Sequence, residues 1–134
     1  GNGGGGGAGG HGNDGYGLGQ GSPNGGKGGA GLASSITGSS VTRASGGSAY
    51  YQVSPGSPAR SPNVTGGGGG ATTINGTANT GGGGAADNGN GGSGVVILRM
   101  ATANYSGTTT GSPTVTTSGS DTILTFTGSG SYTA

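Results

Sequence analysis

Large apolar residues are sparse over the first 94 positions and become regular only afterwards. The continuous apolar run VVILRM at 95–100 follows Gly94, and its shortness and β-branched residues predict a strand buried on both faces. Two Thr-rich runs, 114–117 and 122–127, are joined by SGSD at 118–121, which predicts a β-hairpin. Residues 129–133 are expected to form a last edge strand, and no stretch has the period of an α-helix.

Earlier in the chain, residues 1–31 and 66–94 consist mainly of glycine runs broken by small polar residues. Turns are expected near 13–14 and 22–25 and at the Asn-Gly pairs 75–76, 88–89 and 90–91. Short extended pieces around Ile36 and Val41 are expected to bend at Gly38. Residues 44–65 carry paired tyrosines and the prolines at 55, 58 and 62, so we expect an exposed loop there.

This composition raises the question of what holds the chain together. Glycine supplies 41 of 134 residues, whereas Val, Ile, Leu, Phe and Met together supply 16. Burial of so few large side chains does not offset the conformational entropy of ordering the whole chain. The chain is therefore either disordered or held by dense hydrogen bonding between main-chain groups, which glycine permits because it has no side chain.

Two glycine-based structures can supply such bonding. Collagen requires glycine at every third position and abundant proline, which the continuous glycine runs and five prolines exclude. The remaining structure is a bundle of polyglycine II helices, in which each helix bonds several neighbours. We therefore expect an irregular or all-β single domain without α-helix. Residues 1–94 form a polyglycine II layer with an exposed loop at 44–65, and residues 95–134 form a small packed β-sheet.

Charge and cysteine content exclude several classes of partner. Lys27, Arg43, Arg60 and Arg99 are scattered, so there is no basic stripe for nucleic acid. The absence of cysteine excludes a disulfide scaffold, and no apolar run is long enough to span a membrane. The chain starts within a glycine run and is expected to be a fragment or a processed product.

Candidate catalytic and cofactor motifs lack the surroundings that their chemistry needs. GKGGAG at 26–31 matches GxGxxG and residues 21–27 match GxxxxGK. The first has no strand–helix frame, and the second is followed by Gly28 where a magnesium-binding hydroxyl belongs. His11 and Asp14 are too few for a metal site or a catalytic triad. We expect no enzyme activity, no catalytic or metal-binding residue and no cofactor.

Several stretches nevertheless resemble a known family. GGSGVVILR at 91–99, TTTGSPTVTT at 108–117, LTFTGSGSY at 124–132 and residues 26–47 are similar to the glycine-rich domains of bacteriophage tail fibres and tail adhesins. The resemblance implies stacked polyglycine II helices capped by variable loops that contact the host receptor. It also implies a virion or extracellular location and association with fibre subunits, which are commonly trimeric. By this analogy the candidate receptor contacts are Tyr50, Tyr51, Gln52, Arg60 and Asn63.

Other functions fit the same residues. A purely structural subunit of a fibre, sheath or filament would use the same glycine layers without touching a receptor. Threonine rows at 108–117 permit ice binding, and plain disorder remains an alternative to any fold. Tyr50 and Tyr51 serve equally well as packing residues on the glycine layer.

Overall fold

The computed structural model describes residues 4–15, 25–49, 74–86 and 88–134. In chain order, its elements there are β1 (Leu32–Ser34), β2 (Val41–Arg43), β3 (Val96–Ala101), the 3-10 helix η1 (Thr102–Asn104), β4 (Thr109–Thr110), β5 (Thr114–Ser118), β6 (Asp121–Phe126) and β7 (Ser131–Tyr132). These strands pair antiparallel, and the described residues contain no α-helix. The all-β or irregular class expected from the sequence is therefore confirmed.

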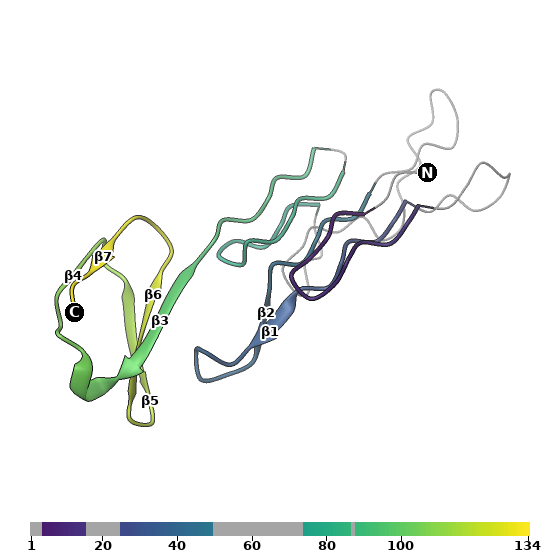
Figure 1. The fold of residues 1–134 in the computed structure, drawn as a ribbon. Helices are drawn as coiled ribbons and strands as arrows, with labels where there is room; N and C mark the ends of the chain where they lie inside the picture. Colours follow the sequence, from purple (N-terminus) through teal and green to yellow (C-terminus); the bar gives the residue numbers. More distant parts are fainter. Residues whose placement is uncertain (1–3, 16–24, 50–73, 87) are drawn as a thin grey trace, which may run out of the picture.

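The C-terminal third of the chain forms a three-stranded sheet in the order β3–β6–β5 (Figure 1). Threonine and β-branched residues favour this extended backbone. Gly119, at φ +61°, lies in the tight turn between β5 and β6, where Ser118 pairs with Asp121. The predicted hairpin is thus confirmed. The predicted last strand is also present as β7, which pairs with β4.

The core of this sheet is its central strand, β6. Thr122, Ile123 and Leu124 are 2%, 1% and 0% exposed. Successive side chains point to opposite faces of a sheet, so both faces of β6 are covered. The strand predicted at 95–100 forms as β3, but its predicted burial on both faces is wrong. β3 lies at the edge of the sheet and leaves Val96 59% exposed, because the hairpin places β6 in the middle.

Different parts of the chain cover the two faces of β6. On one face, the Thr122 hydroxyl donates to the Thr102 hydroxyl in η1 at 3.0 Å. Gly130 lies so close to the ring of Phe126 on that face that a Cβ atom on Gly130 would be 2.8 Å from it. At the other face, the β1–β2 loop approaches the sheet, and Gly38, at φ +92°, lies beside the Ser118 side chain. The expected bend at Gly38 is confirmed, but the extended piece before it is Leu32–Ser34, and Ile36 lies in the turn.

Residues 4–15, 25–31, 44–49, 74–86 and 88–94 form what is called here the glycine-rich region. Main-chain hydrogen bonds join its segments, and the central segment, residues 44–49, bonds to three neighbours. A strand in a sheet has neighbours on only two sides. The bonds of the central segment to those neighbours are Gly5 N to Gly47 O (3.0 Å), Ala8 N to Ala44 O (2.8 Å), Gly46 N to Gly29 O (2.9 Å), Ala49 N to Gly26 O (2.8 Å), Ala44 N to Thr80 O (2.8 Å), Gly83 N to Ser45 O (2.9 Å) and Ala86 N to Ser48 O (2.9 Å).

These contacts repeat every three residues along the chain. Each of the three neighbours meets the central segment through groups three positions apart, such as the carbonyls of Ala44 and Gly47. Exposure follows the same period. Positions 4, 7 and 10 are half-buried and the positions between them exposed, and the same holds for 89, 92 and 95. A β-strand repeats every two residues and an α-helix every 3.6, so the glycine-rich region has neither geometry.

Glycine is needed where these segments touch. A Cβ atom on Gly28 would lie 2.0 Å from the carbonyl oxygen of Gly46, and one on Gly12 would lie 2.1 Å from that of Gly4. Lys27 and Ala30, by contrast, are exposed. Glycine therefore fills most of the contact positions, and the buried residues of this region that do carry side chains, Ser48, Ala49 and Ala85, are small.

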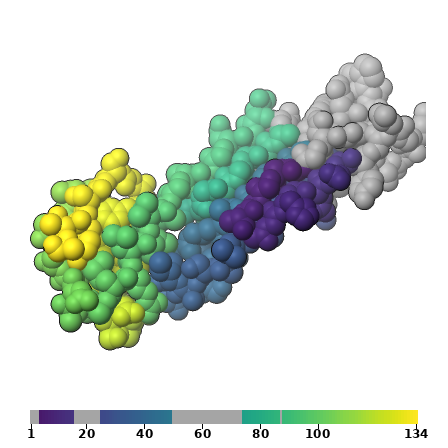
Figure 2. Space-filling model, viewed as in Figure 1, coloured from purple at the N-terminus to yellow at the C-terminus, as the bar shows by residue number. Residues whose placement is uncertain are grey.

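The hydrogen bonds also define two ends of the glycine-rich region. At the proximal end, next to the sheet, lie Ala8, Ala44 and Thr80, joined in a chain of bonds. At the opposite or distal end lie Asn13, Gly26 and Ala49. Figures 1 and 2 show the sheet and the glycine-rich region following one another along an elongated molecule.

Two local predictions differ from the structure. The exposed loop expected at 44–65 does not start at Ala44, because residues 44–49 are the half-buried or buried central segment. Residues 44–49 enter the interior because all of them are small, although they contain no long glycine run. The turn expected near 13–14 lies instead at Ala8–Gly9, where Gly7 and Gly10 bond each other's main chain.

Candidate functional site

The distal end of the glycine-rich region is the candidate site, because the chain leaves and re-enters the region there. The predicted receptor contacts Tyr50, Tyr51, Gln52, Arg60 and Asn63 all lie outside the described residues. The structure does place Ala49, which directly precedes them in sequence. Ala49 is 7% exposed and its N–H donates to Gly26 O at 2.8 Å, so the start of this stretch is firmly held.

Further main-chain bonds tie together the other segments that end here. Residues 15, 25, 49 and 74 border the two longer stretches that lie outside the described residues. Each of these border positions is close to a bonded pair. The pairs are Gly4 N to Asn13 O (3.0 Å), Asn13 N to Lys27 O (2.9 Å), Ala86 N to Ser48 O (2.9 Å) and Ala85 N to Ile74 O (2.8 Å). The distal end is thus a closely bonded platform from which both stretches start and to which both return.

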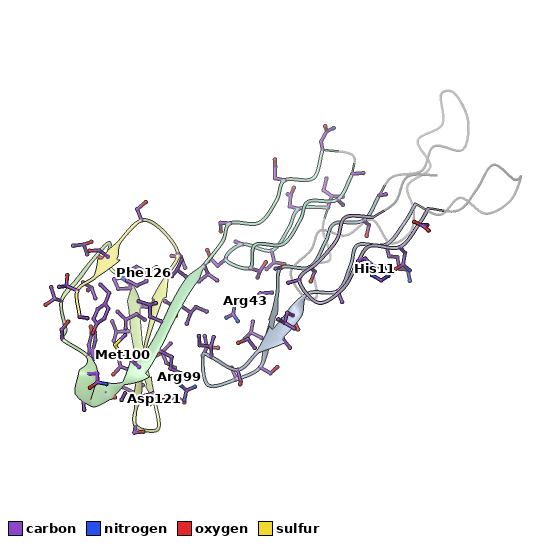
Figure 3. All side chains as sticks on the ribbon, in the orientation of Figure 1. His11, Arg43, Arg99, Met100, Asp121 and Phe126 are labelled. Carbon is purple, nitrogen blue, oxygen red and sulfur yellow. The ribbon has the colours of Figure 1, made fainter. Side chains whose placement is uncertain are left out.

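Ionisable side chains in this part of the region are few. His11, Asp14 and Lys27 are all exposed, and Figure 3 shows His11 on the outer side of the glycine-rich region. Across the described ranges, no group of three or more His, Cys, Asp or Glu side chains is placed to hold a metal ion. His11 and Asp14, weighed in the sequence as the start of a metal site, therefore have no third described ligand.

A second group of polar contacts joins the segment 74–80 to the segment 88–94. The Asn75 Oδ1 accepts the N–H of Asn90 at 2.9 Å. The Ser93 hydroxyl accepts the N–H of Asn79 at 2.9 Å and donates to the Asn79 Oδ1 at 3.0 Å. The sequence identified Asn75 and Asn90 only as turn residues, and their role in joining two segments was missed. Asparagine spaced along otherwise bare glycine segments is the signal that could have indicated it.

A third polar contact lies between the sheet and the β1–β2 loop. Arg99 Nε donates to Asp121 Oδ2 at 2.8 Å, and Arg99 Nη1 donates to the Ile36 carbonyl at 3.4 Å (Figure 3). Both charged side chains are 32% exposed. Arg43 in β2 has a buried Nη1 atom without a hydrogen-bond partner among the described residues. One guanidinium without a second ligand group does not form a binding site.

An aromatic contact joins the residue that follows η1 to strand β7. The rings of Tyr105 and Tyr132 stack with centroids 5.9 Å apart and an interplanar angle of 24°. The Tyr132 hydroxyl donates to Asn104 O at 3.0 Å and accepts the N–H of Ser106 at 3.3 Å. The Tyr132 hydroxyl is thus already bonded on both sides, and the stacked pair serves packing.

None of these clusters combines a nucleophile with a base and an orienting group. In the described part of the chain, no helix is long and apolar enough to cross a membrane. Comparison of the chain with protein-family models, with curated proteins and with solved structures gives no match. The local geometry and the sequence are therefore the observations from which a function is inferred.

Proposed function

We propose that the segments of the glycine-rich region are polyglycine II helices packed side by side. A polyglycine II helix has three residues per turn and no internal hydrogen bonds, so its main-chain groups point outward. The three-residue period of contacts and exposure supports this assignment. The three bonded neighbours of residues 44–49 support it as well, since outward groups at successive positions face different directions.

On this scaffold, the function we propose is that of a receptor-binding, glycine-rich domain of a phage tail fibre or adhesin. The bundle would present loops at its distal end to the host cell surface. One observation carries most weight, namely that the border residues of the stretches 16–24 and 50–73 meet at one bonded end. A rigid end that carries loops is a common design for binding, because variable residues are positioned without contributing to the fold.

The residue types in the longer stretch support the same function. Tyr50, Tyr51 and Arg60 are of the kinds most enriched at binding hot spots. The sheet occupies the opposite end of the glycine-rich region, where β3 begins two residues after Gly94. The sheet end is thus the end we assign to attachment within a fibre, and the distal end is the one that would face the host.

Binding to bacterial cells tests this function. The fluorescently labelled protein would be applied to a panel of bacterial strains and measured by flow cytometry. Binding to a subset of strains is expected. A variant with residues 50–63 replaced by a Gly-Ser linker of equal length should lose that binding while keeping the melting temperature. The matched control is Ser39→Ala with Ser40→Ala, in the exposed β1–β2 loop, which should bind as the unmodified protein does.

Two results would speak against receptor binding. One is undiminished binding by the linker variant, which would place any contact elsewhere on the surface. The other is the absence of binding to every strain together with filaments in electron micrographs, which would support a purely structural fibre or sheath subunit instead.

A further inference from the structure

Three Asn-Gly pairs lie within the described residues, and they differ in how the glycine N–H is held. Gly76 N–H donates to Asn90 O at 2.8 Å, and Gly89 N–H donates to Ala85 O at 3.1 Å. Gly91 N–H has no hydrogen bond among the described residues. Both Asn90 and Gly91 are also exposed. The third pair is thus the one with a free main-chain nitrogen beside an accessible asparagine.

Steric surroundings separate the three pairs in the same way. A Cβ atom on Gly76 would lie 2.4 Å from Gly82 O, and one on Gly89 would lie 2.3 Å from Ile74 O. A Cβ atom on Gly91 would lie 3.7 Å from its nearest described neighbour, which is an ordinary contact. Gly76 and Gly89 are therefore confined by the backbone around them, whereas Gly91 has room to move.

From these differences we propose that Asn90 is a selective site of spontaneous deamidation, with water as the only co-reactant. The main-chain nitrogen of Gly91 attacks Cγ of Asn90 and forms an N–C bond. The bond from Cγ to the side-chain amide nitrogen breaks, and that nitrogen leaves as ammonia with the proton from Gly91. Water then opens the five-membered succinimide at either carbonyl carbon, which yields aspartate or isoaspartate. No atom is oxidised or reduced.

The products would alter an edge of the glycine-rich region. Isoaspartate lengthens the main chain by one methylene group between positions 90 and 91, and both products add a negative charge. Asn90 N–H donates to Asn75 Oδ1, and two residues later Gly92 N–H donates to Gly82 O at 2.8 Å. An added methylene group between the N–H groups of Asn90 and Gly92 changes the distance between them, so both hydrogen bonds cannot keep their present geometry. The modification is therefore expected to weaken the attachment of the segment 88–94.

Peptide mapping by mass spectrometry of the whole folded protein, incubated in mildly alkaline buffer, tests this proposal. Labelling with an isoaspartyl methyltransferase identifies the isoaspartate product. Among the three described Asn-Gly pairs, Asn90 is expected to react first. Asn75 and Asn88 should react about fivefold more slowly, because each requires the rupture of a hydrogen bond worth about 1 kcal/mol, which corresponds to a rate ratio of about five. In urea sufficient to unfold the chain, the three rates should become similar.

Gly91→Ala provides the matched variant. Its added methyl group has room in the fold but hinders attack by the nitrogen, so the Asn90 reaction should slow severalfold with an unchanged melting temperature. The proposal is overturned if Asn75 or Asn88 reacts as fast as Asn90 in the folded protein. It is equally overturned if Asn90 reacts only after unfolding in urea.

Discussion

The α-carbon of Gly47 faces the carbonyl oxygen of Gly84 so closely that a Cβ atom on Gly47 would lie 1.9 Å from that oxygen. Gly47 belongs to the buried central segment, and Gly84 belongs to one of its bonded neighbours. The separation of these two segments is therefore set by the absence of a side chain. Any larger residue at position 47 has to push two hydrogen-bonded segments apart.

Gly47→Ala is accordingly expected to destabilise the protein by about 1–3 kcal/mol or more, in the range of overpacked interiors. The methyl group meets main-chain atoms, which cannot rotate away as a flexible side chain can. Chemical denaturation followed by circular dichroism measures the change in free energy of unfolding. A loss smaller than the error of that measurement would contradict the close packing at this position.

Gly6→Ala should have the opposite effect. A Cβ atom on Gly6 would have no atom within 4 Å, and Gly6 is exposed. Alanine restricts the unfolded chain more than glycine does, so a gain of about 0.4–1 kcal/mol is expected. The same denaturation experiment measures it. Equal destabilisation by Gly6→Ala and Gly47→Ala would show that glycine is required throughout, not only at contacts.

Amide hydrogen exchange provides a direct test of the main-chain network. The N–H groups of Gly46 and Ala49 donate to segment 25–31, whereas that of Gly6 has no bond among the described residues. Exchange measured by NMR should therefore be slow at Gly46 and Ala49 and fast at Gly6. Uniformly fast exchange across these residues would favour the disordered alternative.

In the C-terminal part, Tyr132→Phe should cost about 1–2 kcal/mol. The substitution removes the hydroxyl that bonds both Asn104 O and Ser106 N–H, each bond contributing on the order of 1 kcal/mol. The control is Tyr105→Phe, which keeps the stacked ring and removes a hydroxyl for which the described residues provide no bond. Thermal unfolding should leave this control unchanged, and similar losses in both variants would refute the assigned role of the Tyr132 hydroxyl.

The Arg99–Asp121 ion pair should contribute little by itself. Both side chains are 32% exposed, and pairs of this kind contribute about 0.2–1 kcal/mol. A double-mutant cycle with Arg99→Ala and Asp121→Ala should give a coupling energy in that range. Because Arg99 also donates to Ile36 O, only Arg99→Ala should speed amide exchange in the β1–β2 loop. A coupling of several kcal/mol would indicate a stronger contact than the geometry supports.

The sequence predicted the elements whose residues have strong intrinsic preferences. The hairpin at 114–127 was predictable because alternating threonines meet a turn that contains Gly119. The edge position of β3 was not, because VVILRM has the same composition whether it forms a central or an outer strand. Strand order depends on pairing across the sheet, which the local pattern does not encode.

In the glycine-rich region, too, some features were predictable from the sequence and others were not. Its need for main-chain bonding followed from the composition, but the position of 44–49 at its centre did not. Prolines further along made residues 44–65 resemble a single loop, although Ser45 and Ser48 accept bonds from the segment 81–86. The candidate contacts from Tyr50 to Asn63 lie outside the described residues and remain predictions.

The replacement of apolar packing by main-chain bonding has a calorimetric consequence. Exposure of apolar surface raises the heat capacity on unfolding, whereas exposure of peptide groups lowers it. A region held by amide–carbonyl bonds and almost free of large side chains therefore has an unusually small heat-capacity increment per residue. Its stability should change less steeply with cooling than that of a domain of equal length with an apolar core. A structure of this kind therefore stays folded over a broad range of environmental temperatures.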